Sequence, residues 1–411
     1  MEFIADFHIH SKYSRATSRD MDIQHITEWA KLKGITLMGT GDFTHHLWLE
    51  ECKAVFEDLG NGLFKHKDVY FILTAEISSI YSKKGRTYRI HNIVFSPSFK
   101  TTDKINETLS RYGNLASDGR PILGMDAQEV ARIVFDIDEN CMIVPGHAWT
   151  PWFSVFGSMS GFDRIEDCFE DQTPKIFALE TGLSSDPAMN WRLSALDRFT
   201  LISNSDSHSP SKIGREANVF DCEFNYKTIR EVLKTKDKQG FLYTIEFFPE
   251  EGKYHYDGHR LCGVRLSPQE TRSHKGKCPK CGRPVTVGVM NRVEQLADRP
   301  QGFVPQNSIP FKNLIPLDEI VAEAKGLGKT AAAVEKEYHN CIAKFGTEFE
   351  ILLRASREDL LKNLPPRVAQ GVLRVREGKV NIQAGYDGEY GKISIFGEEK
   401  KDTTEKQLNL F

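Results

Sequence analysis

The chain of 411 residues lacks any run of about 18 apolar residues, the length that a helix needs to cross a membrane, so no membrane span is expected. Its start, MEFIADFHIH, lacks the basic region and the long apolar stretch of a signal peptide. A disulfide framework is also missing, because only Cys278 and Cys281 of the eight cysteines lie close together in sequence. These absences predict a cytoplasmic protein with reduced thiols.

A strong charge of one sign is absent too. The net charge of −3 excludes a chain that is basic over its whole surface. Residues 251–300 nevertheless contain ten Lys or Arg and five Asp or Glu, an excess that predicts contact with phosphates. A solvated surface is the alternative interpretation. The length and the ordinary composition indicate roughly two or three domains.

Short apolar runs with few charges predict seven strands. The runs are residues 3–7, 35–40, 69–74, 91–95, 141–145, 176–180 and 200–204. Such runs are typical of strands that are buried on both faces. Between the first two, Ile23, Ile26 and Ala30 have helical spacing, and Gly34 ends the pattern. The alternation predicts an α/β fold with a parallel sheet, open or closed into a barrel.

Side chains that can bind metal ions stand at or after each predicted strand. They are His8, His10, Asp42, His45, Glu76, His91, His147, Glu180, Asp206 and His208. One such histidine alone is more often structural. Because parallel strands end on one face of the fold, the repetition predicts a shared site.

The mixture of imidazoles and carboxylates suits Zn²⁺, Mn²⁺ or Fe²⁺ and is less typical of Mg²⁺ alone. We expect two or three divalent ions in the barrel, with Zn²⁺, Mn²⁺ or Mg²⁺ as candidates. Two ions roughly 4 Å apart would activate a water and stabilise the oxygens of a phosphate ester. The residues expected to act in catalysis are His8, His10, Asp42, Glu76, His147, Asp206 and His208. Amide hydrolysis is the chemical alternative.

These motifs resemble the PHP family (polymerase and histidinol phosphatase). The resemblance is carried by residues 6–11 (DFHIHS), Gly41, Asp42, Glu76, His91, His147 and residues 206–208 (DSH). It implies a distorted seven-stranded β/α barrel with three metal ions. The family's Asp-His pair is here DFTH at 42–45, so His45 is the predicted ligand and His46 its competitor. Glu180 has no place in the family's ligand set and is expected to lie behind the ligands.

A CxxC pair, Cys278 and Cys281, is followed by glycine, as in a zinc knuckle. Cys262 precedes the pair, and Arg265 stands where a complete zinc ribbon would have another cysteine. The missing ligand is then His259, with His255 as the alternative. We predict one structural zinc ion bound by His259, Cys262, Cys278 and Cys281.

The stretches KYHYDGHRLCGV, CPKCG and VEQLADRP, together with the PHP motifs, resemble the endonuclease Q family over nearly the whole chain. The resemblance implies a metal-dependent DNA repair nuclease that cuts on the 5′ side of uracil, hypoxanthine, xanthine or an abasic site. It implies a barrel (1–245), a zinc segment (246–300), a helical DNA-binding domain (301–396) and a tail (397–411). Trp149 and Trp152 are predicted to stack on bases, with core packing as the alternative.

The sequence GLGKT at 326–330 resembles a P-loop, but Glu323 stands at the position of its first glycine and a helical pattern precedes it. A nucleotide-driven helicase is therefore disfavoured. The turn is more typical of a helix–hairpin–helix motif, whose backbone amides hold a DNA phosphate, and Lys329 is predicted to bind DNA.

The last five residues, QLNLF, resemble the peptide with which bacterial proteins bind the β subunit of the sliding clamp. The predicted contacts are Gln407, Leu408, Leu410 and Phe411, after a polar linker. A tail folded onto its own domain is the alternative. DNA and clamp as partners predict a nucleoid-associated protein.

Two other functions stay open. A PHP-type phosphatase of small molecules would explain the barrel but would leave the zinc segment, the basic stretch and the tail without a role. A clamp-tethered DNA-binding protein with an inactive barrel would need missing ligands, and none is clearly missing.

Overall fold

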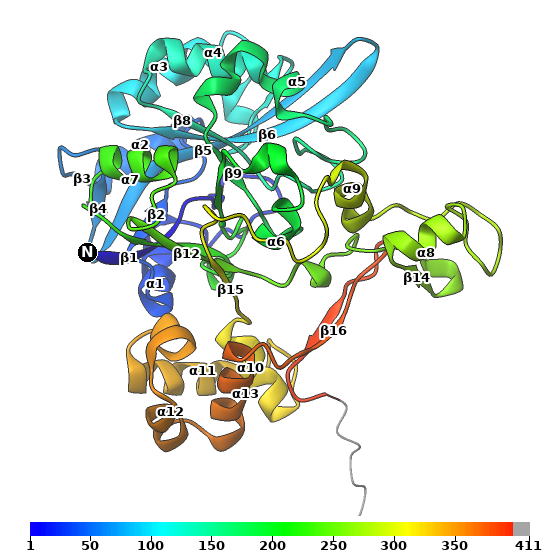
Figure 1. Cartoon of the computed structure of the whole chain (residues 1–411). Coiled ribbons are helices and arrows are strands. Elements are labelled where there is room, and N and C mark those ends of the chain that lie inside the picture. The colour runs from blue at the N-terminus through cyan, green and yellow to red at the C-terminus, as the bar shows by residue number, and fades with distance from the viewer. Residues whose placement is uncertain (398–411) are drawn as a thin grey trace, which may run out of the picture.

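The computed structural model describes residues 1–397 and contains an 11-stranded mixed sheet (Figure 1). Its main path runs β15-β12-β11-β1-β2-β5-β4-β3, with β6 and β7 paired to β5, and β8 paired to β6. The strands are β1 (Glu2–Asp6), β2 (Leu37–Gly39), β3 (Glu57–Asp58), β4 (Phe64–His66), β5 (Val69–Lys83), β6 (Arg86–Ser96), β7 (Ile122–Leu123), β8 (Met142–Pro145), β11 (Ala217–Asp221), β12 (Phe241–Glu246) and β15 (Phe311–Asn313).

A separate parallel pair, β9 (Ala178–Glu180) and β10 (Thr200–Ile202), brings the sheet toward closure. The chain after β10 meets the chain after β1 through a parallel bridge between Ile9 and Ser207. The amide of His10 donates a hydrogen bond of 2.9 Å to the carbonyl of Ser207. The strands therefore form an incomplete ring, the distorted barrel expected of this α/β chain.

All seven predicted strands form, as β1, β2, β5, β6, β8, β9 and β10. The expected parallel arrangement is wrong for β6, which runs antiparallel to both β5 and β8. A tight turn at Lys84 and Gly85, with φ of 52° and 78°, joins β5 directly to β6 and leaves no room for a crossover helix. The sequence patterns also missed β11 and β12, which pair antiparallel beside β1.

Helices cover the outside of the barrel. The predicted helix at 23–33 is α1 (Ile23–Lys33); Asp22 caps its start and Gly34, with φ of 88°, ends it. Ile26 and Ala30 on its inner face are fully buried. The others are α2 (His46–Val55), α3 (Phe99–Leu109), α4 (Ala127–Ile137), α5 (Ile165–Phe169), α6 (Pro187–Asn190) and α7 (Tyr226–Thr235).

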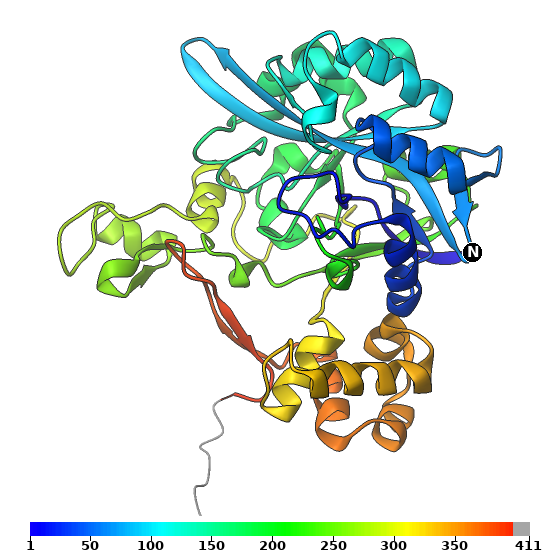
Figure 2. The same cartoon turned by 180° about the vertical axis from the view of Figure 1, so that it is seen from behind.

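The zinc segment projects from the side of the barrel (Figures 1 and 2). It contains β13 (Asp257–His259), β14 (Val264–Leu266), α8 (Pro268–Ser273) and α9 (Val289–Leu296). Val264, Leu266, Cys278 and Val285 form its own small core. A core of this size is too small to hold a fold by burial alone, which is the usual reason for a metal in such segments.

The helical part at the C-terminal end lies beneath the barrel in Figure 1. It contains α10 (Leu317–Lys325), α11 (Ala332–Phe345), α12 (Arg357–Asn363) and α13 (Pro366–Arg376). The predicted β element forms a hairpin of β16 (Asn381–Gln383) and β17 (Lys392–Ser394) that reaches the zinc segment. There the carboxylate of Asp387 accepts hydrogen bonds from the Arg260 amide (2.7 Å) and the Thr286 hydroxyl (2.5 Å).

The domain boundaries stay predictions, and one strand complicates them. β15 lies beyond residue 300, yet it pairs with β12 of the barrel sheet. Within residues 1–397, no helix has the length and apolar character needed to cross a membrane. The predicted clamp contacts at 407–411 lie outside the described residues.

Candidate metal centre and substrate pocket

The barrel contains two groups of side chains that could hold metal ions. In the first, each of His8, His10, Glu76 and Asp206 offers a ligand atom, and these atoms lie within 4.8 Å of one another. His10 Nε2 is 3.2 Å from Glu76 Oε2 and 3.1 Å from Asp206 Oδ1. His8 and His10 follow β1 and Asp206 follows β10, so the bridge between Ile9 and Ser207 brings these ligands together.

The second group contains Glu76, His91 and His147. Glu76 Oε1 lies 2.6 Å from His91 Nδ1 and 3.0 Å from His147 Nε2. Glu76 therefore turns Oε2 toward the first group and Oε1 toward the second. Glu76 and His91 come from within the long strands β5 and β6, not from strand ends as predicted.

The first group has the buried, unpaired atoms that a bound cation would satisfy. His8 Nε2, His10 Nε2 and Asp206 Oδ1 are buried and make no hydrogen bond within the described chain. Unpaired buried polar atoms are rare because each one lowers stability. Three of them converge here, and their mixed nitrogen and oxygen character fits a divalent transition metal.

Glu180 holds His8 from behind. Its carboxylate is fully buried and lies 3.0 Å from His8 Nδ1. It also accepts hydrogen bonds from the His147 amide (2.7 Å) and from Asn204 Nδ2 (2.9 Å). A proton on His8 Nδ1 leaves Nε2 free to face the metal group. This is the supporting position expected for Glu180.

Asp42 differs from its prediction as a ligand. Its Oδ1 lies 3.1 Å from His10 Nδ1, and its Oδ2 accepts hydrogen bonds from the Ser11 amide (2.6 Å), the Ser11 hydroxyl (2.7 Å) and the Ser14 hydroxyl (2.8 Å). Both oxygens are thus engaged, and Asp42 belongs to neither metal group. The geometry favours Asp42 as the residue that orients His10, as Glu180 orients His8.

The remaining predicted ligands also lie outside both groups. His45 stacks on Tyr13, with ring centroids 4.4 Å apart, and its competitor His46 is exposed at the start of α2. The His208 ring lies 4.5 Å from the His10 ring, but its Nδ1 is hydrogen-bonded to the Asp206 carbonyl at 2.9 Å. Six of the nine predicted ligands therefore meet in the two groups: His8, His10, Glu76, His91, His147 and Asp206.

The charges in the site favour ionised carboxylates. Burial alone would raise the pKa of Glu76, but the neighbouring cations Arg120 and His8 lower it well below its usual value. Burial opposes the charged form of His8, yet Glu180 and Glu76 raise its pKa well above the usual value. Burial lowers the pKa of His91 to about 4, which keeps its imidazole neutral and able to bind a metal.

A cavity of about 440 Å³ opens beside the second group. Its walls include His91, His147, Asp206, Arg15, Arg120 and Trp152. Arg120 Nη1 lies 3.1 Å from Glu76 Oε2. The sequence patterns do not reveal Arg120, because it comes from an irregular loop that carries no spacing pattern.

The two predicted stacking residues differ in accessibility. Trp152 is 38% exposed on the cavity wall and meets Tyr254 of the zinc segment edge-on, at 5.6 Å. Trp149 is fully buried, packs on Phe156 and donates to Asn190 Oδ1 at 2.8 Å. This burial argues against the predicted stacking role of Trp149.

Lys329 follows α10 in the turn to α11, where its Nζ lies 2.6 Å from a Glu319 oxygen. The Lys329 side chain is 54% exposed. Two helices joined by this turn agree with the predicted helix–hairpin–helix element. The DNA contact of Lys329 stays a prediction.

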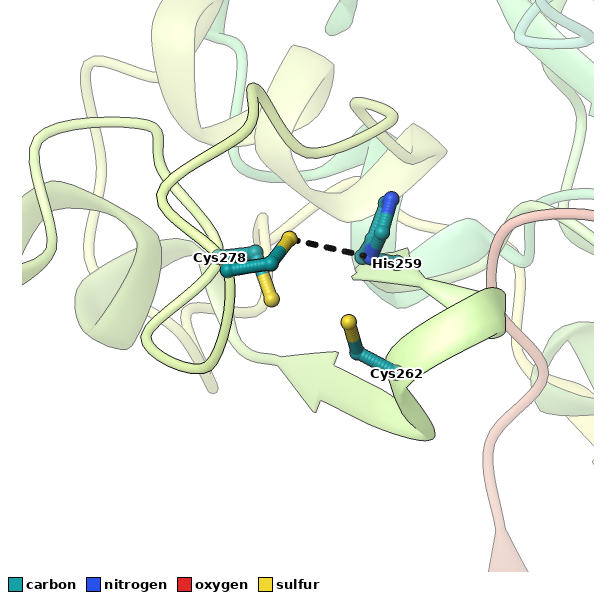
Figure 3. Close-up of side chains that lie close together, drawn as sticks. His259, Cys262 and Cys278 are labelled. Atoms are coloured by element: carbon teal, nitrogen blue, oxygen red, sulfur yellow. Dashed lines mark hydrogen bonds between the residues drawn. The ribbon is translucent and has the colours of Figure 1, made fainter.

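A third group of potential ligands lies in the zinc segment. His259, Cys262, Cys278 and Cys281 offer ligand atoms within 4.8 Å of one another, and His259 Nδ1 is 3.7 Å from Cys281 Sγ. Figure 3 shows His259, Cys262 and Cys278 turned toward a common point. His255 is buried and lies outside the group, so the structure favours His259 over His255 as the fourth ligand.

Comparisons with known proteins agree with this architecture. Residues 316–379 match the family model of the MJ0043 C-terminal domain. The uncharacterized protein MJ0043 of Methanocaldococcus jannaschii is 34% identical over 307 residues, which cover 71% of this chain and 37% of that protein. The chain thus spans well under half of that relative. The uncharacterized protein YqxK of Bacillus subtilis is 29% identical over 95% of this chain and 98% of its own length.

Solved structures match the chain over its full length. The lesion-specific endonuclease PfuEndoQ from Pyrococcus furiosus is 32% identical, with a TM-score of 0.87 and 100% coverage of both chains. The chain belongs to the endonuclease Q family. A second endonuclease Q structure, in complex with a 27-mer duplex substrate that has an abasic lesion at the active site, is 33% identical with a TM-score of 0.85 and the same coverage. The family resemblance seen in the sequence is confirmed.

Proposed function

We propose that this chain is a metal-dependent DNA repair endonuclease. It hydrolyses the phosphodiester bond on the 5′ side of a deaminated base (uracil, hypoxanthine or xanthine) or of an abasic site. The observation that carries the proposal is Glu76, which faces both metal groups inside a barrel that matches endonuclease Q over its full length. The alignment with an endonuclease Q bound to abasic DNA supports the substrate class.

Two divalent ions fit the barrel, with Zn²⁺, Mn²⁺ and Mg²⁺ as candidates and His208 near enough to His10 to assist a third. One ion would be held by His8, His10, Glu76 and Asp206, and the other by Glu76, His91 and His147. When bound, such ions make a water acidic and stabilise the charge of a reacting phosphate ester. Glu180 and Asp42 orient the imidazoles, and Arg120 provides a guanidinium that can pair with a phosphate oxygen.

The cavity suits a nucleotide that has left the base stack. Its volume of about 440 Å³ lies within the usual range for small-ligand sites. An enzyme that acts at one damaged base in a duplex must take that nucleotide out of the stack to reach it. Trp152 offers an exposed ring for stacking at the mouth. The basic residues of the zinc segment and Lys329 would hold phosphates farther away.

The structural zinc ion and the sliding clamp would bind to parts of the chain outside the barrel. A zinc ion bound by His259, Cys262, Cys278 and Cys281 would hold the zinc segment in shape, because four protein ligands leave no position for substrate. We also propose that Gln407, Leu408, Leu410 and Phe411 bind the bacterial sliding clamp, which would keep the enzyme near replicating DNA.

The test is a nicking assay with Mg²⁺ or Mn²⁺ and end-labelled duplexes. Each duplex carries one uracil, hypoxanthine or abasic site, and an undamaged duplex of the same sequence is the control. We expect a single cut on the 5′ side of the lesion and none in the control. Glu76→Gln should abolish cutting while leaving the melting temperature of the protein close to that of wild type. Turnover of a small phosphate ester without any lesion-dependent nick would contradict the proposal and favour a phosphatase.

A further inference from the structure

Strands β5 and β6 continue past the metal site as a two-stranded arm, residues 80–89 (the β5–β6 arm). Figures 1 and 2 show the arm extending beyond the barrel on the same side of the molecule as the zinc segment. Glu76 and His91 of the metal groups lie on the same two strands. The eleven pairs of the β5–β6 ladder thus fix the arm relative to the site.

The charge of the arm is of one sign. It contains Lys83, Lys84, Arg86 and Arg89 and has no Asp or Glu. Lys83 pairs with Glu170 and Asp126 of the barrel. Within residues 1–397, no carboxylate lies within 4.0 Å of the charged groups of Lys84, Arg86 or Arg89. None of these three is in a direct ion pair, and on one face of the arm Lys84 and Arg86 border a groove that Asp163, Glu166, Asp167 and Glu170 also line.

One face of the arm continues the wall of the metal site. Directly paired residues of an antiparallel ladder lie on the same face, and the pairs here are Ser78 with His91, Ile80 with Arg89, and Ser82 with Thr87. Ser82 and Thr87 are exposed and Arg89 is partly exposed. The Arg89 guanidinium also lies 5.9 Å from the Phe153 ring, which lines the cavity. From the cavity to the tip, this face offers hydroxyls and a guanidinium without a carboxylate.

We propose that the β5–β6 arm binds the sugar–phosphate backbone of duplex DNA on one side of the cleavage site. A regular polyanion is the partner that fits Lys84 in the exposed turn together with a face that carries Arg89 and two hydroxyls. Eight residues separate Glu76 from Lys84, and a strand rises about 3.3 Å per residue, so the reach is roughly 26 Å. At about 3.4 Å per base pair, the arm covers roughly eight base pairs. The zinc segment meets the cavity wall separately, where Tyr254 contacts Trp152.

This inference rests on the proposed function. It is tested with DNA duplexes that differ in the length of the flanks on either side of the lesion. The variant Lys84→Glu/Arg86→Glu reverses two charges at the tip. Its matched control, Lys227→Glu/Lys234→Glu, reverses two exposed lysines on α7, on the opposite side of the barrel in Figure 1. Binding is measured by fluorescence anisotropy without added divalent metal. Four duplexes are compared. One has an abasic site with long flanks on both sides, and one of the same length is undamaged. The other two have an abasic site with one flank, on the 5′ or the 3′ side, shortened to about four base pairs, which is half the reach of the arm.

We expect the arm variant to bind the long duplex roughly tenfold more weakly, with a salt slope lower by about 2, because two phosphate contacts are lost. On the duplex that keeps the flank bound by the arm, the arm variant should lose the same affinity as on the long duplex. On the duplex that lacks this flank, the variant and wild type should bind equally. The control variant should bind like wild type. Equal losses on both shortened duplexes, or no loss beyond that of the control, would overturn the proposal.

The experiments distinguish a failure of the repair function from a failure of the arm proposal. If the protein does not nick damaged DNA, yet the arm variant still binds the undamaged long duplex more weakly, the repair function is wrong and the arm is a DNA contact. If lesion-dependent nicking is present and the arm variant binds every duplex like wild type, the repair function stands and the arm proposal is wrong.

Discussion

The ammonium group of Lys33 lies 2.7 Å from the carboxylate of Glu348, and both side chains are only 3% exposed. Lys33 is the last residue of α1 on the barrel, and Glu348 follows α11 in the helical part. Glu348 also accepts hydrogen bonds from the Tyr338 hydroxyl (2.8 Å) and the Leu317 amide (3.0 Å). This buried ion pair joins the barrel to the helical part, so the two are expected to unfold together.

Lys33→Met should lower the free energy of unfolding by roughly 3–5 kcal/mol, because it leaves the Glu348 charge buried without its partner. Urea denaturation followed by circular dichroism measures the change. The control is Lys31→Met, whose pair with Asp68 at 2.8 Å is exposed and should contribute less than about 1 kcal/mol. A loss for Lys33→Met no larger than that of the control would show that the pair does not join the two parts.

Glu180→Gln should weaken metal binding and cleavage by roughly 10–100-fold without removing any proposed ligand. The amide cannot hold the proton on His8 Nδ1 as a carboxylate does, so His8 Nε2 is less well directed toward the ion. Calorimetric titration with Mn²⁺ measures the affinity, and nicking at rising Mn²⁺ should recover part of the lost rate. Glu28→Gln, at an exposed position of α1, is the control. An unchanged Mn²⁺ affinity would contradict the orienting role.

Cys278→Ser should remove one zinc ion per chain and loosen the zinc segment, because the small core around Cys278 has few other contacts. Metal analysis of the purified protein gives the zinc content, and hydrogen exchange reports the loosening. Protection in β5 and β6 should stay as in wild type. Cys222→Ser, outside the predicted zinc site, should keep its zinc. Full zinc content in the Cys278 variant would rule out the predicted ligand set.

The buried carboxyl group of Glu246 should make the free energy of unfolding fall as the pH rises. Burial raises the pKa of Glu246 to about 8 from the usual 4.5, so the folded chain holds a proton that the unfolded chain has lost. More protons bound in the folded state make the free energy of unfolding decrease as pH rises through this window. Glu246→Gln should therefore gain stability relative to wild type at pH 8 and gain less at pH 5.

Urea denaturation across this range measures the difference. Glu231→Gln, at an exposed position of α7, is the control and should follow the wild-type curve. Parallel curves for Glu246→Gln and wild type would contradict the buried, protonated state.

The strands of the barrel could be predicted because each buried strand carries a short apolar run, and the ligands after β1, β8 and β10 followed from their place next to those runs. The antiparallel direction of β6 depended on a turn, Lys84-Gly85, that lacks the usual Asn or Asp. The role of Asp42 could not be predicted, since it depends on where a loop places Ser11 and Ser14. Arg120 reaches the site only through the folded path of its loop.

One carboxylate with an oxygen in each metal group has a consequence for how the barrel fills with ions. An ion in the first group would hold Oε2 of Glu76 and so restrict where Oε1 lies in the second group. If both ions bind, their occupancies would be thermodynamically linked, and the factor by which the first ion changes the affinity for the second would equal the factor by which the second changes the affinity for the first. A titration should be described by a coupling constant for the pair, not by two independent sites.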